Sequence, residues 1–265
     1  TQYQYDIFYQ KLNSAGVNLT SPIRLTINPA DSVYPKIALD SNGYVHVVWQ
    51  DYAYGGPDIF YKKLNNNGMP ISPDIRITSS LNSKKPVIDL DSQNNIHIAW
   101  MQDFASLYYI KLNNAGINLT SPILVHQQGA TPSEIPPAIG VDQFGNVHLV
   151  WSAYYSGCCG PQLDYRKLDN NGHFLTPALV VDSQTYNYNP SLAIDSQGNV
   201  HIVRTYLYYG GIRYLKLDNN GSSLVNTIQL TSSGDYSKAA IDTQGQLHVV
   251  WVEGYAPAQY EISYL

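Results

Sequence analysis

Short apolar runs with two apolar faces recur along the whole chain. In the first such run, Val45, Val47 and Trp49 lie on one face of an extended strand. The opposite face holds His46 and Val48. A strand that is apolar on both faces is typical of a sheet packed between two neighbouring sheets. Asn-Gly and related turns separate the runs, and no window shows helical periodicity, so the pattern predicts an all-β protein.

The runs belong to an internal repeat. The segment from Asp40 to Trp49 recurs four times at intervals of 47 to 53 residues, as Asp91 to Trp100, Asp142 to Trp151, Asp195 to Arg204 and Asp242 to Trp251. A period near 50 residues that carries several strand signals is typical of propeller blades, whereas the hairpin turns argue against a parallel β-solenoid.

Each repeat contains four strand signals. The first usually follows a Pro, the second is the run described above, the third carries Tyr-x-Lys-Leu, and the fourth follows a Gly-containing turn. The chain holds five copies of the first, second and fourth signals but six of the third, because both 5–12 and 258–265 match it. The sequence therefore predicts a single domain over residues 1–265, a five-bladed β-propeller with four-stranded antiparallel blades. The repeats start near 35, 86, 137, 190 and 237, and residues 1–34 complete the last blade through the strand at 23–26, which closes the ring.

The segment Pro-x-Ile-Ala-x-Asp-x-x-Gly-x-Val at Pro35 to Val45 resembles the inner hairpin of NHL-repeat and sialidase-superfamily (Asp-box-like) propellers. The Tyr-x-Lys-Leu segment departs from NHL repeats, and the full Asp-box spelling is missing. The resemblance implies a propeller and carries over no active site.

Composition narrows the possible partners. Charged residues make up 13% of the chain and the net charge is −5, with no Lys/Arg cluster longer than a pair, which argues against a nucleic-acid partner. No apolar run approaches the ~20 residues of a membrane span, so no membrane insertion is expected. A surface built from neutral polar residues, and a start at Thr1, favour a processed extracellular or cell-surface protein.

Aromatic residues gather in the loops expected on one face, those that join second to third strands and one blade to the next. Tyr offers a flat apolar ring and a hydroxyl, which suits stacking on sugar rings or holding a peptide, although such rings also simply seal short loops. The candidate ligand-binding residues are Tyr52, Tyr54, Phe104, Tyr154, Tyr155, Tyr186, Tyr188, Tyr208, Tyr209 and Tyr255, and the same loops hold Tyr34, Tyr206 and Tyr236.

The two cysteines, Cys158 and Cys159, are adjacent in a Gly- and Pro-containing loop on this face. In an oxidising compartment each is the other's nearest partner, which predicts a vicinal disulfide, with two reduced thiols as the alternative.

Five histidines occupy one repeat position and predict a buried structural hydrogen bond rather than a shared metal site, since strands off the axis hold them apart. They are His46, His97, His148, His201 and His248. The repeated aspartates at 40, 91, 142, 195 and 242 are expected to bond their turns, and the repeated lysines at 11, 63, 111, 167 and 216 to be structural. No metal or other cofactor is expected.

A catalytic site is not singled out by the sequence. All five arginines fall in strand segments, which argues against a sialidase-like triad. Carboxylates on the loop face that could form an acid/base pair are Asp31, Asp51, Asp58, Asp103, Glu134, Asp235 and Glu253.

Three sequons, at Asn18, Asn118 and Asn220, map to third-to-fourth turns on the face opposite the aromatic loops, where glycosylation would leave that face bare. Three functions stay open: a non-catalytic module for glycans or cell-surface ligands, a subunit that self-associates into a polymer or filament through the surplus strand, and a glycoside hydrolase of a five-bladed propeller type.

Overall fold

The computed structural model describes residues 4–103, 106–127, 135–155, 157–207, 210–255 and 259–264, with side chains up to residue 253. Over these ranges the chain forms 21 β-strands and no helix, so the all-β prediction is confirmed. Accordingly, no helix in the described ranges has the length and apolarity to cross a membrane.

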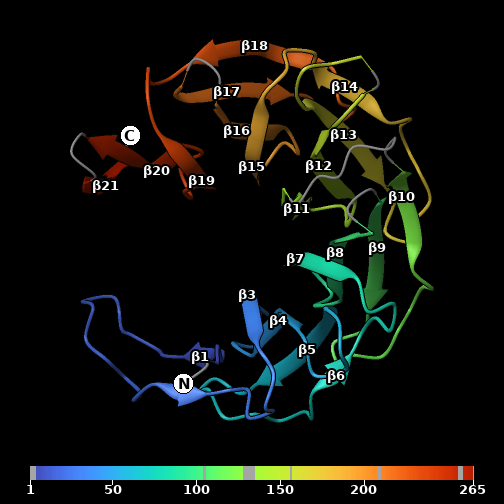
Figure 1. The fold of residues 1–265 in the computed structure, drawn as a ribbon, viewed down its shortest axis with the longest axis vertical. Helices are drawn as coiled ribbons and strands as arrows, with labels where there is room; N and C mark the ends of the chain where they lie inside the picture. Colours follow the sequence, from blue (N-terminus) through green and yellow to red (C-terminus); the bar gives the residue numbers. More distant parts are fainter. Residues whose placement is uncertain are drawn as a thin grey trace.

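The strands fall into consecutive antiparallel sheets (Figure 1). The four complete sheets comprise β3 (Ser32–Leu39), β4 (Val45–Asp51), β5 (Asp58–Leu64) and β6 (Ile75–Arg76); β7 (Ser83–Leu90), β8 (Ile96–Gln102), β9 (Ser106–Leu112) and β10 (Ile123–Gln127); β11 (Ala138–Val141), β12 (Val147–Ala153), β13 (Gln162–Leu168) and β14 (Leu179–Asp182); and β15 (Asn187–Ile194), β16 (Val200–Tyr206), β17 (Ile212–Leu217) and β18 (Ser223–Gln229). A fifth sheet has three strands, β19 (Asp235–Ile241), β20 (Leu247–Tyr255) and β21 (Gln259–Tyr264), and a two-stranded pair precedes them all, β1 (Phe8–Tyr9) and β2 (Ile23–Arg24). By position in the repeat, the described strands include six third strands, as the sequence predicts.

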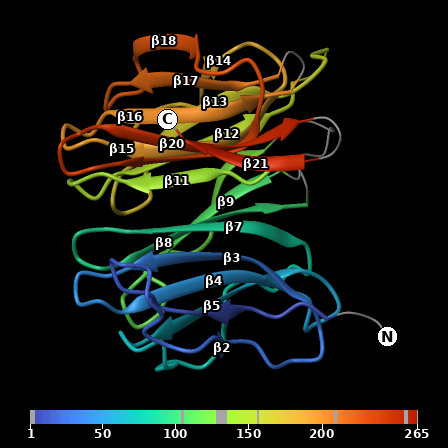
Figure 2. The same ribbon diagram turned by 90° about the vertical axis from the view of Figure 1, so that its left-hand side faces the viewer.

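The sheets are arranged as propeller blades. Each complete sheet is a meander in which neighbours along the chain pair, as where Val48 of β4 lies opposite Tyr61 of β5. The first strand of each sheet lies nearest the centre of the arc in Figure 1, and Figure 2 shows the sheets stacked face to face. This arrangement brings the starts of the five first strands together.

The core lies between consecutive sheets rather than at the centre. Val48 and Tyr61 of one sheet pack with Ile98 and Trp100 of the next. The other face of β4 packs Trp49 against the β1–β2 pair, so both faces of the second strand are buried, as predicted. Burying aromatic and branched side chains on both faces stabilises each inter-sheet contact.

A recurring polar cluster joins each sheet to the following one, and His97 shows its pattern. Burial lowers the pKa of His97, so the imidazole is neutral near pH 7; its Nε2–H donates to Asp91 (3.3 Å) and its Nδ1 accepts from the Tyr109 hydroxyl (2.8 Å). Burial opposes ionisation of Asp91, but hydrogen bonds from His97 and Asn95 outweigh it and hold the pKa of Asp91 below its usual range. The Lys111 ammonium lies 3.3 Å from the Asp91 carboxylate and donates to a backbone carbonyl in the next sheet's last turn (3.1 Å).

Equivalent His–Asp contacts occur at His46, His148, His201 and His248. The predicted hydrogen-bonding role of the repeated histidines and aspartates is confirmed, although the His248 side chain is 40% exposed whereas the other four histidines are buried.

The predicted closure of the ring, with residues 23–26 completing the last blade, is not shown. β2 pairs with β1, and this pair packs on the first complete sheet as a preceding blade would. The turn glycine Gly68 contacts the Tyr9 ring, just as Gly116 contacts Tyr61 one sheet later, and Lys11 donates to Asn66 as Lys63 does to Asn114. Local pairing across one turn, together with these repeated contacts, holds the β1–β2 pair away from β21.

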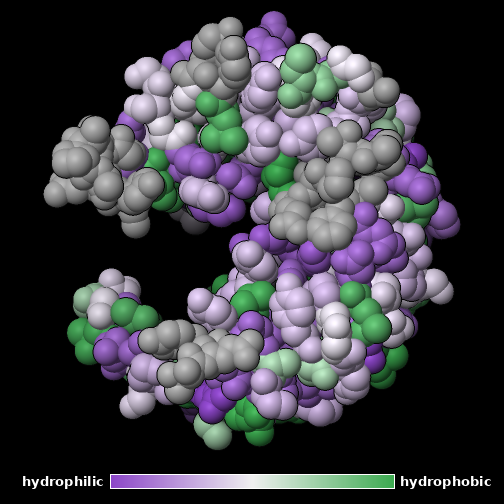
Figure 3. Space-filling view, in the orientation of Figure 1, coloured by the Kyte–Doolittle hydropathy of each residue, from purple (hydrophilic) through white to green (hydrophobic). Residues whose placement is uncertain are grey.

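The arc of sheets is therefore open between the β1–β2 pair and the β19–β21 sheet, and the space-filling view in Figure 3 shows the same opening. Leu12 beside this opening is 51% exposed, whereas its repeat equivalent Leu64 is fully buried. A face that is core elsewhere in the repeat is thus exposed at this end.

Candidate functional site: an axial cavity

Four of the five first strands carry a β-bulge at their inner end. Each of these strands pairs with the second strand of its sheet, and the pairing register shifts beside the position that precedes the repeat's Pro. The four strands are β3, β7, β15 and β19. At each bulge one non-glycine residue takes a left-handed backbone conformation, which costs such a residue about 1–2 kcal/mol. These residues, with their φ values, are Tyr34 (54°), Lys85 (54°), Asn189 (49°) and Tyr236 (53°).

The sequence explains why the bulges form at this point. In β3, β7 and β15 the bulged residue precedes a Pro, which has no N–H to lose from the strand ladder, whereas in β19 it precedes Ser237. The third repeat has Pro136 at the equivalent position, and Pro cannot take a positive φ, so β11 begins only at Ala138.

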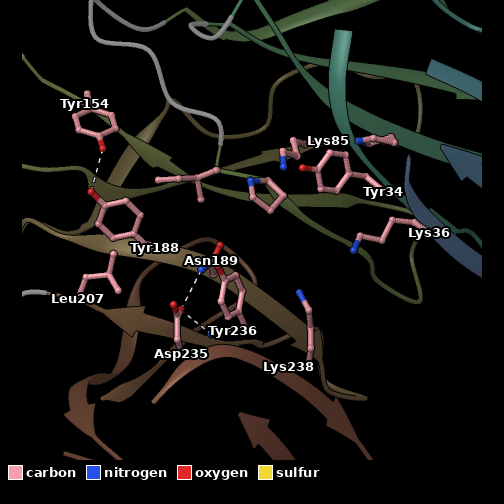
Figure 4. Close-up of a pocket in the computed structure, with 13 residues that line it drawn as sticks. Tyr34, Lys36, Lys85, Tyr154, Tyr188, Asn189, Leu207, Asp235, Tyr236 and Lys238 are labelled. Carbon is pink, nitrogen blue, oxygen red and sulfur yellow. Dashed lines mark hydrogen bonds between the residues drawn. The ribbon is translucent and has the colours of Figure 1, made fainter. Parts of the chain in front are cut away.

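The four bulged side chains meet at one cavity of about 580 Å³ (Figure 4). All five sheets contribute to its lining. The lining residues are Tyr34, Lys36, Lys85, Pro86, Ile135, Pro136, Tyr154, Tyr188, Asn189, Leu207, Asp235, Tyr236 and Lys238. The cavity thus lies where the first strands begin, on the face on which the sequence placed the aromatic loops.

Aromatic rings form one part of this lining. Tyr34 and Tyr236 are 48% and 63% exposed, so their rings are accessible to a ligand. The hydroxyls of Tyr154 and Tyr188 lie 3.1 Å apart, and burial, followed by this hydrogen bond, raises the pKa of Tyr154. The cavity therefore presents two open rings and a pair of neutral hydroxyls.

Cationic groups form another part. Lys36, Lys85 and Lys238 come from β3, β7 and β19, and the Lys85 ammonium lies 3.4 Å from the centre of the Tyr34 ring. Burial lowers the pKa of Lys36, and the positive charge of Lys85 lowers it further. Burial and the charge of Lys36 do the same to Lys238.

Asp235 is the one carboxyl group among the described residues that line the cavity. Its Oδ1 accepts hydrogen bonds from the Asn189 amide (3.1 Å), the Thr205 hydroxyl (2.8 Å) and the Tyr236 backbone N–H (2.6 Å). This carboxylate holds the bulges of β15 and β19 in place.

Of the ten residues predicted to bind ligand, Tyr154 and Tyr188 line the cavity. Tyr52 lies elsewhere and accepts a hydrogen bond from Gln50 (2.9 Å), while Tyr54 stacks on Phe60 under Arg76. The Tyr186 ring packs against Gly160 of the cysteine loop. Phe104, Tyr208 and Tyr209 lie outside the described residues, and of Tyr255 only the backbone is described, at the end of β20.

Tyr155 belongs to a separate pair, in which its exposed side chain reaches the buried Asp164. Its hydroxyl donates to Asp164 (2.5 Å), and burial raises the pKa of Asp164 to about 6, partly offset by this hydrogen bond. The pair adjoins the cysteine loop, where the Cys158 backbone N–H donates to the Tyr155 carbonyl oxygen (3.1 Å).

The predicted disulfide is not supported: Cys158 and Cys159 are free thiols, and Cys159 is exposed. Adjacent Cα atoms joined by a trans peptide are about 3.8 Å apart, below the ~4.4–6.8 Å of ordinary disulfides, so the bond would require a distorted peptide. Cys158 Sγ instead lies 3.7 Å from the Gln162 side-chain amide, which donates to it.

Other candidate residues have structural contacts. Asp51 accepts from Ser32 and Trp49, and Asp58 pairs with Arg76. All five arginines lie in strands, as predicted. Further contacts from the list of loop-face carboxylates are those of Asp31 with the Tyr5 N–H, Asp103 with Asn82, and Glu253 with Trp251, while Glu134 lies outside the described residues.

The sequon residues Asn18, Asn118 and Asn220 are exposed, on the turns that follow third strands. Their glycosylation stays a prediction.

The sequence interpretation missed the three lysines and Asn189. The signal that could have found them is a polar residue beside the repeat's Pro position, as in Tyr34-Pro35-Lys36, Lys85-Pro86, Asn189-Pro190 and Tyr236-Ser237-Lys238.

Comparisons with known proteins support the architecture. No protein-family model and no curated protein matches the chain, but many solved structures share its fold. A protein of unknown function from Dyadobacter fermentans has 11% identity and a TM-score of 0.64 over 88% of this chain and 78% of its own. An α-L-arabinanase from Penicillium chrysogenum, complexed with arabinobiose, has 12% identity and a TM-score of 0.63 over 88% and 80%.

An ulvan lyase bound to -[GlcA(1-4)Rha3S]- has 12% identity and a TM-score of 0.62 over 93% and 67%. At such low identity these likenesses show the propeller-type fold alone. The narrower resemblance to NHL-repeat and sialidase propellers stays a prediction.

Proposed function

We propose that this protein binds glycans through the axial cavity. A volume of about 580 Å³ lies in the usual range for small-ligand sites, roughly 300–1,000 Å³. The exposed rings of Tyr34 and Tyr236 offer flat apolar surfaces for sugar rings, and the cavity's amide, hydroxyl and ammonium groups offer hydrogen bonds to sugar hydroxyls. Two of the fold neighbours are an arabinanase with bound arabinobiose and an ulvan lyase with a bound saccharide.

The observation that carries this proposal is the repeated strain at the bulges. Each left-handed residue costs the fold free energy, and four sheets bear that cost at the same position. Their side chains all line one cavity instead of packing between sheets. A shared, strained and accessible arrangement of this kind supports a binding role.

We propose a binding function rather than a catalytic one because glycoside hydrolysis by the usual route needs two carboxyl groups. Among the described lining residues Asp235 alone supplies one, and it already accepts three hydrogen bonds. Hydrolysis is the competing hypothesis, and release of new reducing ends from any bound glycan would favour it.

A glycan array on the purified protein, followed by titration calorimetry on the best ligand, tests the proposal. Tyr34→Ala and Tyr236→Ala should each weaken binding by roughly tenfold, since stacking contacts of this kind contribute about 1 kcal/mol or more. Tyr52→Ala, outside the cavity, is the matched control and should bind normally. If Tyr34→Ala and Tyr236→Ala both bind the glycan with unchanged affinity, the axial cavity is not the binding site.

A second candidate function, self-association, is favoured by the exposed face at the open end. Phe8, Leu12, Ile37 and Leu39 are each more than half exposed there. We infer that the C-terminal sheet of a second copy fits this face, because the same repeat positions are covered by a neighbouring sheet elsewhere. Assembly would then proceed head to tail, and closure or a filament would depend on the rotation per subunit.

Light scattering over a range of concentrations tests this role. Deleting residues 1–12 would also strip Ile7 and Tyr9 from the Trp49 core, so the double variant Phe8→Ser/Leu12→Ser is the sharper probe. Mass that rises with concentration in the parent and not in the variant supports assembly. A constant monomer mass in both the parent protein and the variant refutes self-association. The single five-bladed ring over residues 1–265 would then be the proposal to test.

An extracellular or cell-surface location belongs to the first proposal, since glycan ligands are abundant there. The composition favours it, and secretion of the natural gene product tests it.

A further inference from the structure

Three ammonium groups converge on the axial cavity, whose described lining holds a single carboxylate. Figure 4 shows the Lys36 and Lys238 side chains extending into the cavity from opposite strands, with Lys85 beside Tyr34. Asp235 is the one carboxylate in the described lining, and its Oδ1 is already engaged. The described lining therefore carries an excess of positive charge.

Lys36 and Lys238 differ in this from lysines elsewhere in the fold. Within the described ranges neither ammonium has a hydrogen bond or an ion pair, whereas other lysines bind side-chain or backbone oxygens. Examples are Lys62 with Asp74 (2.6 Å), Lys111 with Asp91 (3.3 Å) and Lys216 with Asp195 (3.0 Å).

Lys36 is half-buried and Lys238 is exposed at the cavity. Like-charged ammonium groups that share one cavity without an anionic partner repel each other. The pKa of each lysine is lowered, first by burial and then by the charge of a neighbouring lysine, so the surroundings disfavour both positive charges. An anionic group between the two lysines would offset the repulsion between their ammonium groups and would accept charge-assisted hydrogen bonds from them.

We propose that the cavity selects acidic saccharides, with a carboxylate or sulfate of the glycan held by Lys36 and Lys238 and its ring against Tyr34 or Tyr236. This rests on the proposed glycan-binding function and names its ligand class. Lys85, which already lies over the Tyr34 ring, positions that ring and adds to the positive field.

The test is titration calorimetry with four probes of similar length. They are an oligogalacturonate, its methyl ester, a chondroitin sulfate oligosaccharide and a neutral galacto-oligosaccharide. The oligogalacturonate, the sulfated probe or both should bind at least about tenfold more tightly than the two uncharged probes, and binding should weaken as salt is raised. The first and third probes distinguish a carboxylate from a sulfate.

Substitutions of the lysines test which side chains bind the acidic group of the glycan. Lys36→Gln and Lys238→Gln should each weaken acidic-probe binding about tenfold without lowering the melting temperature, because each removes a repulsion. Lys84→Gln is the matched control, since Lys84 adjoins Lys85 in β7 and does not line the cavity.

The outcomes separate the two proposals. If the uncharged probes bind as tightly as the acidic ones and Tyr34→Ala still weakens binding, glycan recognition stands and acidic selectivity falls. Acidic binding that both lysine variants leave intact overturns the assignment of these lysines. If no probe and no array glycan binds, both proposals fail.

Discussion

Replacing His148 with Ala should destabilise the fold by an amount that depends on pH in a defined direction. His148 is fully buried; its Nδ1 accepts from the Tyr165 hydroxyl (2.9 Å) and its Nε2–H donates to Asp142 (3.3 Å). Removing the ring leaves two buried polar groups without this partner, which costs about 1–3 kcal/mol near pH 7.5.

The pH dependence follows from the lowered pKa of His148, which is caused mainly by burial and opposed by Asp142. As pH falls below the unfolded value of about 6.5, the unfolded chain takes up a proton at His148 before the folded protein does. The wild type therefore holds this contribution to stability above pH 6.5 and loses it as the pH falls towards the folded pKa.

The variant has no such proton to bind. The difference in unfolding free energy between the two proteins should narrow by up to about 1.4 kcal/mol from pH 7.5 to pH 5.5, if the folded imidazole stays neutral over that range. Asp89 and Asp164, whose pKa values burial raises to about 6, titrate in the same window in both proteins and cancel from the difference.

Urea unfolding followed by tryptophan fluorescence at each half pH unit measures this difference. His173→Ala is the control, because His173 lies exposed on a turn, and its substitution should change stability little at any pH. A difference that stays constant, or that widens as the solution is acidified, would show that the buried imidazole is charged and would refute the reasoning.

Two further predictions rest on single contacts. Gly172→Ala should destabilise by about 1–3 kcal/mol in thermal unfolding, because an added Cβ would lie 2.4 Å from Ile123 and φ is +86°. Gly16→Ala, at the same turn position with φ +75° and open space around it, should cost less, and equal losses would contradict the packing argument. Alkylation of the native protein without reductant should add two groups by intact mass, at Cys159 before Cys158, whereas no addition would restore the disulfide prediction.

Local pattern was enough to predict the strands and their repeat. Alternation in Val45 to Trp49 depends on which side chains leave the two faces of one strand, and Asp40 to Gly43 closes its own turn through short-range hydrogen bonds. The role of the repeated histidines could be predicted as well. His97 finds its partners Asp91 and Tyr109 within its own sheet, six and twelve residues away along the chain.

The structure does not show two features that the sequence predicted, and both depend on competing partners or on fine geometry. Ile23 to Thr26 has a fourth-strand pattern, but pattern alone does not say whether β1 or β21 is its neighbour, and the nearer partner forms the pair. The adjacent cysteines are near each other along the chain, but a bond between them would require a distorted peptide, and both are free thiols in the structure.

The sequence by itself thus determined the all-β class, the roughly fifty-residue repeat and the His–Asp contact of each repeat, because these depend on contacts inside one repeat. Only the tertiary structure decided that the arc is open and that Tyr34, Lys36, Lys85 and Lys238 share one cavity. Residues 34 and 238 are separated by nearly the whole chain, and their meeting depends on how five sheets are set around one axis. The bulges that direct these side chains inward arise from strand register, which is a property of paired strands rather than of any single segment.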